Sequence, residues 1–207
     1  MYTPDSFKEN DISRLHELMQ RHPFALLLTA HDGGIAATHL PFMIDADRGK
    51  HGTLLAHMAR ANPHWKLFDG LRQVLVVFTG AHAYISPSWY ESPVTVPTWN
   101  YAVVHAHGRP VIIRDKVWVR AMLERLVTIH EATINPPWST VQANEYVDEQ
   151  LDYIVAFEIE IERLEGKFKL NQNRSRADQE GVVRALGDSD DPLKREIAEL
   201  MRANLKK

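Results

Sequence analysis

Residues 157–162 narrow the choice of fold more than any other stretch of the chain. Apolar side chains at Phe157, Ile159 and Ile161 alternate there with a glutamate at every intervening position. Because successive side chains of a β-strand point to opposite faces, this pattern predicts a strand with one face in a core and the other in solvent.

Short polar turns join further apolar runs into hairpins. Phe24–Thr29 and Ile35–Ile44 flank the turn His31–Gly34, whose Asp-Gly-Gly sequence tolerates the positive φ angles of tight hairpins. A second polar turn at Asp45–His51 leads to Thr53–His57. The three apolar segments are therefore predicted to form an antiparallel meander.

The rest of the chain alternates between strand and helix signals. Further strands are predicted at 74–78 and 81–85, with a break at Gly80, and from 101 to about 113. Helices are predicted to begin after Asn10 or Asp11, at Asn62-Pro63, after Asp115, at Ser139 with Gln142 as a capping box, and near Ala177 and Leu193. This order predicts an α+β fold, in which a mostly antiparallel, closed or partly closed barrel with inserted helices covers residues 1–170 and a C-terminal helical arm covers 171–207.

The composition excludes several classes of protein. With no cysteine among 207 residues, the chain has no disulfide, thiolate metal site, iron–sulfur cluster or cysteine nucleophile. A formal net charge of −3 provides no global field for nucleic acid. Dinucleotide-fold, phosphate-loop and serine-hydrolase motifs are missing. No apolar run approaches the ~20 residues of a membrane helix and no signal peptide precedes Thr3-Pro4, so a cytoplasmic protein without membrane contact is expected.

The passage His57–Trp65 carries a signal for anion binding. Asn62 is a favoured N-cap and Pro63 suits the first helical position, so a helix is predicted to start here. Helix N-termini attract anions, and Arg60 precedes the cap by two residues. A phosphate could dock at this point. The alternative is a normally capped helix with a solvated Arg60.

Two other regions are candidates for ligand contact. The segment Ser86–Tyr101 concentrates tryptophan, tyrosine and proline, which predicts burial against a partner subunit or a flat ligand, or packing of a stiff loop on its own barrel. His105 and His107 share one side of a predicted strand, a spacing that metal or haem ligation could use, but nothing completes a ligand set and a pair of ordinary strand histidines is favoured.

The two C-terminal helices have the outline of a helix-turn-helix. Their connection contains the acidic run Asp188-Ser189-Asp190-Asp191, which a phosphate backbone would repel. A packing arm is therefore expected, with direct DNA binding only weakly supported.

Several segments together resemble a known family. They are Met1–Pro4, Ala37–Pro41, His57–Pro63, Tyr84–Tyr90, Val96–Tyr101 and Lys169–Arg174. In this order they are similar to the PaiB-type FMN-binding negative transcriptional regulators, a branch of the FMN-binding split barrels related to pyridoxamine-phosphate oxidases. The resemblance implies a mostly antiparallel split β-barrel, a homodimer, and FMN at the subunit interface.

The resemblance also implies site residues. The resemblance makes Arg60 the leading phosphate ligand. Other flavin contacts are implied in the same two barrel segments, at Thr38, His39, Leu40, Pro41, His57, Met58 and Asn62. Further contacts are implied at Trp99 and Asn100, and across the dimer at Lys169, Asn171 and Gln172. No metal site is expected.

The function implied is that of an FMN-binding transcriptional regulator. Pyridoxamine-phosphate oxidases use a C-terminal arginine–histidine motif for substrate, and Lys169–Arg174 contains no histidine, so that activity is not expected. Two alternatives stay open: an FMN-dependent oxidoreductase acting on a small molecule, and a haem-binding or haem-degrading split barrel.

Overall fold

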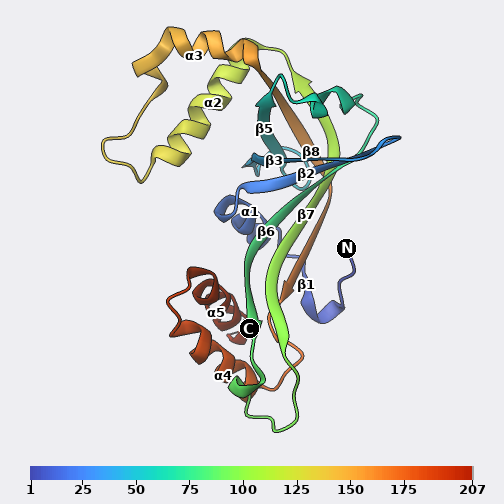
Figure 1. The fold of residues 1–207 in the computed structure, drawn as a ribbon, viewed down its shortest axis with the longest axis vertical. Helices are drawn as coiled ribbons and strands as arrows, with labels where there is room; N and C mark the ends of the chain where they lie inside the picture. Colours follow the sequence, from blue (N-terminus) through green and yellow to red (C-terminus); the bar gives the residue numbers. More distant parts are fainter. Residues whose placement is uncertain (207) are drawn as a thin grey trace. The chain divides into compact units, whose positions relative to one another are not determined.

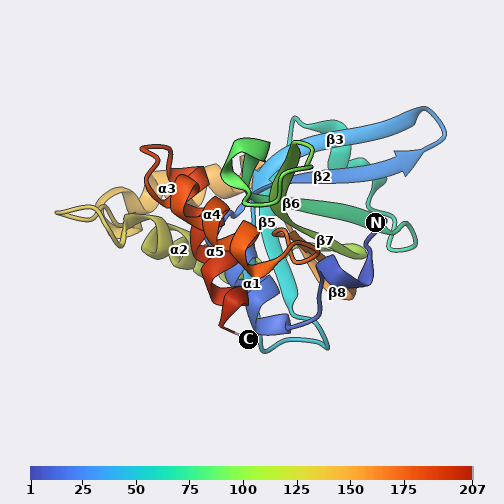
Figure 2. The ribbon, with the colours of Figure 1, turned by 90° about the horizontal axis from the view of Figure 1, so that it is seen from below.

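The computed structural model describes residues 1–206, which form one eight-stranded antiparallel sheet and five α-helices (Figures 1 and 2). The strands are β1 (Lys8–Glu9), β2 (Phe24–His31), β3 (Gly34–Pro41), β4 (Met43–Asp45), β5 (Thr53–Ala59), β6 (Val74–Ile85), β7 (Thr98–Ile113) and β8 (Ile154–Lys169). The α-helices are α1 (Ile12–Arg21), α2 (Lys116–Glu131), α3 (Asn144–Gln150), α4 (Arg176–Gly187) and α5 (Pro192–Leu205). The predicted α+β class is confirmed.

The strand order is β3-β2-β6-β7-β8-β5-β4, and β1 pairs with β8. The predicted hairpin is present, with Phe24 opposite Pro41 and His31 opposite Gly34, whose φ of 121° matches the expected turn. The single strand expected over 35–44 is instead divided at Phe42. Residues before the division pair with β2, while β4 pairs with β5. Phe42 itself is buried and donates its N–H to the carbonyl of Pro23 at 2.9 Å, one position beyond the last β2–β3 pair, so the chain passes from one strand pairing to the other at this residue.

The strand break expected at Gly80 does not occur, because β6 runs without interruption from Val74 to Ile85. Gly80 is needed for space. A Cβ at this position would lie 3.0 Å from the Leu18 side chain and 3.1 Å from the carbonyl oxygen of Ala102. The glycine therefore allows α1 and β7 to approach β6 closely.

Most predicted helix starts are confirmed by capping bonds. The side chain of Asp11 accepts a hydrogen bond from the N–H of Ser13 in the first turn of α1, and that of Asp115 accepts the N–H groups of Val117 and Trp118 in the first turn of α2. The capping box expected at Ser139 and Gln142 is wrong. Gln142 N–H bonds to the Ser139 backbone carbonyl in a 3₁₀ turn, the Ser139 side chain caps nothing, and α3 begins only at Asn144.

The chain divides into two compact units. Unit 1 comprises Met1–His22, Val77–His105 and Glu165–Lys207, and unit 2 comprises Pro23–Val76 and Ala106–Leu164. Strands β6, β7 and β8 each contribute residues to both units. Within residues 1–206, no helix is long and apolar enough to cross a membrane.

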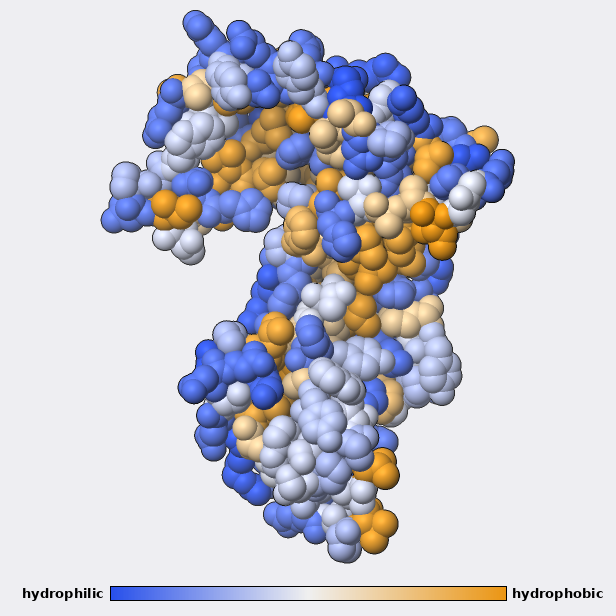
Figure 3. Space-filling view, viewed as in Figure 1, coloured by the Kyte–Doolittle hydropathy of each residue, from blue (hydrophilic) through white to orange (hydrophobic). Residues whose placement is uncertain are grey.

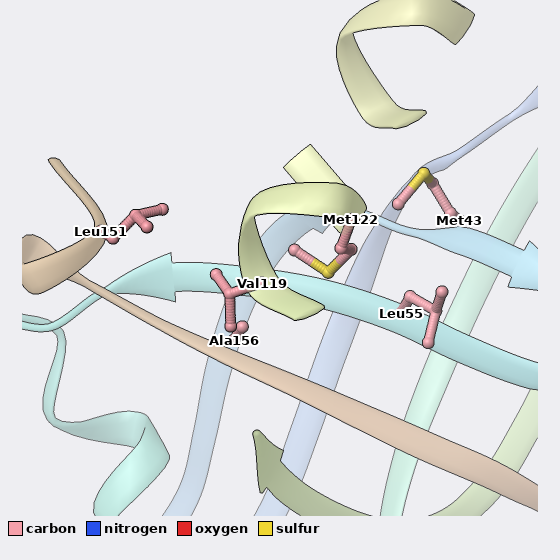
Figure 4. Packing of buried hydrophobic residues seen from close by; sticks show 6 residues of the cluster. All are labelled: Met43, Leu55, Val119, Met122, Leu151 and Ala156. Carbon is pink, nitrogen blue, oxygen red and sulfur yellow. The ribbon is translucent and has the colours of Figure 1, made fainter. Parts of the chain in front are cut away.

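One core cluster of unit 2 lies between α2 and the strands that it covers. Val119 and Met122 of α2 face Met43, Leu55 and Ala156 of the sheet, and Leu151 closes the cluster (Figure 4). Apolar surface also gathers beside α2 in Figure 3, where partly buried side chains surround the same cluster.

Unit 1 has a helical core of its own. In α4 and α5, Leu186, Ile197 and Met201 have no exposed surface, and the two helices lie side by side (Figures 1 and 2). The predicted C-terminal helix pair is therefore confirmed, with a packed apolar seam between its helices.

Candidate functional site

A hydrogen-bonded polar cluster joins the β2–β3 hairpin to the segment that follows β5. Asn62 Nδ2 donates to Thr38 Oγ1 at 3.3 Å, and Thr38 Oγ1 lies 2.8 Å from His64 Nδ1. His64 Nε2 lies 2.8 Å from the hydroxyl of Thr29. We call Thr29, Thr38, Asn62 and His64 the polar cluster.

The hydrogen bonds of the polar cluster assign its protons. Because Thr38 Oγ1 accepts a bond from Asn62, its own hydrogen is available for His64 Nδ1. In that arrangement Nε2 is the protonated nitrogen of His64, and it donates to the hydroxyl of Thr29. Asn62 Oδ1 accepts the backbone N–H of His64 at 3.0 Å. Asn62 Nδ2 gives one of its two hydrogens to Thr38, so the second amide hydrogen is left for a ligand.

Two histidines of unit 2 are held in the neutral form. Burial lowers the pKa of His64, and the nearby charge of His31 lowers it further. Burial also lowers the pKa of His57, which lies on β5. Both imidazoles therefore act as neutral hydrogen-bonding groups near pH 7.

These pKa shifts predict a pH-dependent stability. In the unfolded chain both histidines regain the ordinary pKa of 6.5, so the unfolded state takes up protons first as the pH falls. The stabilisation that comes from keeping both histidines neutral should be fully present above about pH 6.5, and the free energy of unfolding should fall progressively below that pH. Urea titrations of the cofactor-free protein at pH 8, 7, 6.5 and 6 measure this loss. The double variant His57→Gln, His64→Gln should show a flatter profile, and an unchanged profile would contradict the assignment.

Arg60 is positioned by the pairing of β5 with β8. Ala59 lies opposite Ile154, which places the following arginine beside the start of β8. Its Nε donates to the carbonyl of Asp152 at 2.6 Å and its Nη2 to that of Ile154 at 2.8 Å. The side chain is exposed, and these two bonds leave Nη1 for another partner.

The helix expected after Asn62 is one short 3₁₀ segment, Pro63–Leu67. Asn62 does cap it, as predicted, by accepting the N–H of His64. A segment of this length has only a small dipole, so the positive potential at this point comes from the Arg60 guanidinium.

Loss of the Asn62 side chain should measurably destabilise the protein. Asn62→Ala removes the cap and the bond to Thr38, and we expect the free energy of unfolding of the cofactor-free protein to fall by about 1 kcal/mol. Urea denaturation measures this loss. Asn62→Asp keeps the capping acceptor and should recover most of the stability, so an equal loss in both variants would contradict a capping role.

The other candidate residues of unit 2 differ in accessibility. His39 is exposed and stacks on Phe24 with ring centroids 5.9 Å apart. Pro41 and His57 are half-buried, while Leu40 and Met58 belong to the core. Leu40 and Met58 can therefore shape a site but offer little surface to a ligand.

The candidate residues of unit 1 form a second group. Trp99 is 54% exposed and packs edge-on against Tyr84, with ring centroids 6.0 Å apart. Lys169 Nζ is held by the Thr98 hydroxyl and by the carbonyl of Trp99. Burial lowers the pKa of Lys169, and the neighbouring charges of Lys167 and Arg174 add to this effect.

Three candidates of unit 1 are committed to internal contacts. Asn100 is fully buried with its Nδ2 at 3.4 Å from the sulfur of Met201. Asn171 is buried at a φ of 63°, and its Nδ2 donates to the hydroxyl of Tyr90 at 3.1 Å. Gln172 bonds to the backbone of Phe168 and Leu170. Asn171 and Gln172 therefore shape the turn after β8, whereas Asn100 links β7 to α5.

The aromatic segment Ser86–Tyr101 is held to the rest of its own chain by hydrogen bonds at residues 91 and 92. Asp178 of α4 accepts the N–H groups of Glu91 and Ser92 at 2.9 Å and the Ser92 hydroxyl at 2.7 Å. Tyr90 is buried, but Val94 and Val96 stay exposed. These hydrogen bonds from Ser92 and Glu91 lower the pKa of Asp178, so it remains a carboxylate that anchors the loop.

The structure thus groups the candidate residues by unit. Thr38 and Asn62 are in direct contact, whereas Arg60 turns toward the start of β8. Thr29 and His64 complete the polar cluster and were not predicted as site residues. A buried threonine on a strand carries no sequence signal of its own, and only the fold brings Thr29 to His64.

Comparison with known proteins shows the family to which the chain belongs. The family described as "Putative FMN-binding domain" matches residues 1–163. The chain is 33% identical over 207 residues to protease synthase and sporulation protein PAI 2 of Bacillus subtilis, covering 100% of this chain and 99% of the relative. It is 32% identical over 223 residues to the uncharacterized protein AN0679 of Emericella nidulans, covering 88% and 89% of the two chains. The chain therefore belongs to the PaiB-type family of FMN-binding-domain proteins, as its sequence motifs predicted.

Solved structures support the same fold. The FAD and heme binding protein from Mycobacterium smegmatis is similar with a TM-score of 0.58 at 15% identity, over 78% of this chain and 73% of that one. The flavocytochrome Anf3 from Azotobacter vinelandii is similar with a TM-score of 0.58 at 13% identity, over 78% and 69%. At these identities the likeness is one of fold. The predicted α+β architecture, with a mostly antiparallel sheet and C-terminal helices, is confirmed.

Proposed function

We propose that this protein binds FMN and acts as a flavin-dependent transcriptional regulator of the PaiB type. The observation that carries the proposal is the polar cluster, because it joins the two segments, Thr38–Pro41 and His57–Asn62, that the family resemblance assigns to the flavin. The match of residues 1–163 to an FMN-binding domain supports the same cofactor.

The residues present fit FMN. Arg60 has Nη1 available for a phosphate oxygen, and a guanidinium suits phosphate because it offers charge-assisted donors in a fixed plane. Asn62 keeps one amide hydrogen for a ribityl or phosphate oxygen. Thr38 and His57 are half-buried, so each can offer polar atoms to a ligand while staying fixed by the sheet.

The proposal includes a homodimer, in which a second copy completes the flavin site. From unit 1 we propose Trp99 and Lys169 as contacts, because both keep accessible surface. Asn100, Asn171 and Gln172 would support the site through the internal bonds that they already make. FMN supplies a ring that accepts and returns electrons when it is bound.

One measurement tests the cofactor directly. Protein purified without added cofactor should be yellow, with absorbance in the region of 450 nm, about where oxidised flavins absorb, and heat denaturation should release FMN. If the purified protein is colourless, added FMN should bind saturably. A Soret band, or no saturable binding of FMN, would overturn the proposal and direct attention to haem or to another ligand.

The regulatory role needs its own test. A gel-shift assay with the flavin-loaded protein and DNA from its own promoter region, at low salt, should show a retarded band if the protein acts on DNA directly. Absence of a band would remove direct DNA binding and leave regulation through a protein partner. That route predicts that a partner is retained from cell extract by the wild-type protein and released when FMN is removed.

An oxidoreductase is the second candidate, favoured by the exposed ring of Trp99 beside Tyr84, which can stack on a flat substrate or cofactor. Such an enzyme should have its flavin reduced by NADH or NADPH and reoxidised by an acceptor. Unchanged flavin absorbance with both donors under anaerobic conditions would exclude this candidate.

A further inference from the structure

A cavity of about 310 Å³ opens in unit 2, with the start of β8 in its wall. Its wall is formed by the end of β7, the start of β8, the first turns of α2, and the segments that follow β5 and α3. The volume lies at the lower end of the range of about 300–1,000 Å³ that is typical of small-molecule sites.

Positive side chains gather at this cavity. Arg60, Arg114 and Lys116 line it together with one carboxylate, Asp152. Lys116 Nζ pairs with Asp152 at 2.5 Å, and this hydrogen bond and charge lower the pKa of Asp152 and keep it ionised. Arg114 forms no ion pair or hydrogen bond with any residue between 1 and 206. The rim therefore keeps a net positive charge with one uncommitted guanidinium.

The rest of the wall is apolar and branched. Ile112, Ile113, Val119, Leu151 and Val155 line the cavity, and Trp65 adds a ring whose indole N–H is already bonded to the Arg60 carbonyl at 2.9 Å. Such a wall favours an apolar ligand body, while the rim favours an anionic head group.

We propose that this cavity binds a small organic anion with an apolar body, and that Arg114 and Lys116 hold its charged group. The cavity shares Arg60 with the flavin site proposed above, but the polar partners of that site, Thr38 and Asn62, do not line it. The ligand class is set by the pairing of two cations with an aliphatic wall, because neither feature alone would retain an amphipathic anion in water.

Octanoate is a suitable probe, and 1-octanol is its neutral match. Isothermal titration calorimetry on the full-length protein should show saturable octanoate binding at least about tenfold tighter than 1-octanol binding, in the presence and absence of FMN. Arg114→Gln and Lys116→Gln should each weaken octanoate binding about tenfold. Arg125→Gln, on the same helix as Lys116 but outside the cavity, should bind octanoate like the wild type.

The inference would be overturned by the absence of saturable octanoate binding, by equal binding of octanoate and 1-octanol, or by equal octanoate affinity in all three variants. Displacement of octanoate by FMN would also overturn it, because the cavity would then belong to the flavin site. Since octanoate binding is measured on the cofactor-free protein as well, failure of the FMN proposal would leave this test intact.

Discussion

Replacing Phe157 by alanine should lower the free energy of unfolding by about 3–5 kcal/mol, the usual cost of deleting a buried aromatic side chain. Phe157 is fully buried on β8, opposite Ala56 of β5. Its ring lies 5.0 Å from that of Phe68 and meets Phe42 edge-on at 6.3 Å. The loss combines the transfer of the ring to water with the cavity left between two aromatic neighbours.

Urea or thermal denaturation followed by circular dichroism measures this loss. Phe24→Ala is the matched control, because Phe24 also lies on a strand but is 66% exposed. We expect the control to change the free energy of unfolding by less than about 1 kcal/mol. Similar losses in the two variants would contradict the placement of Phe157 in the core. Such a result would also question the β5–β8 register that brings Phe157 there.

Replacing Arg60 by alanine should weaken FMN binding by about 1.5–3 kcal/mol, the range for a hydrogen bond to a charged group. The prediction rests on the free Nη1 of Arg60 and on the proposed role of this residue as the phosphate ligand. Quenching of flavin fluorescence on titration of the cofactor-free protein measures the affinity. Riboflavin, which lacks the phosphate, should bind the wild type and the variant with similar affinity.

Two controls separate a phosphate contact from a structural effect, since Arg60 also bonds to the carbonyls of Asp152 and Ile154. Arg60→Lys keeps the charge but loses the planar donor pair, so its FMN affinity should fall between the wild type and Arg60→Ala. Arg125→Ala, on α2, should leave FMN affinity unchanged. If Arg60→Ala bound FMN like the wild type, the phosphate would be held elsewhere.

Much of the local structure could be predicted because it depends on neighbours in the chain. The β2–β3 turn follows from Gly34, which accepts a positive φ, and the starts of α1 and α2 follow from Asp11 and Asp115, whose side chains accept N–H groups of the first helical turn. The predictions at Gly80 and Ser139 failed for a common reason. A glycine can interrupt a strand or allow another segment to pack closely against it, and packing selected the second outcome at Gly80. A serine can cap an α-helix or precede a 3₁₀ turn, and the second outcome is found at Ser139.

The candidate site was predictable only in part. The motif resemblance singled out Thr38, Asn62 and Arg60 and led to the correct family. It did not indicate that Arg60 turns to the backbone of β8, or that Thr29 closes the cluster through His64. Arg60 and Thr29 are each separated from their hydrogen-bond partners by many residues of the chain. Nothing in the local sequence encodes the strand register that brings these residues together.

The amino-acid sequence alone determined the antiparallel class, the capped helices, the absence of thiol chemistry and the family, because strand alternation, capping, residue type and motif order are all written along the chain. Only the tertiary structure decided the division of the third strand at Phe42, the protonation of His64 and the cationic cavity beside Arg114. Each of these three features depends on burial and on contacts between segments that are distant in the sequence. Such contacts form only when the sheet and α2 have packed.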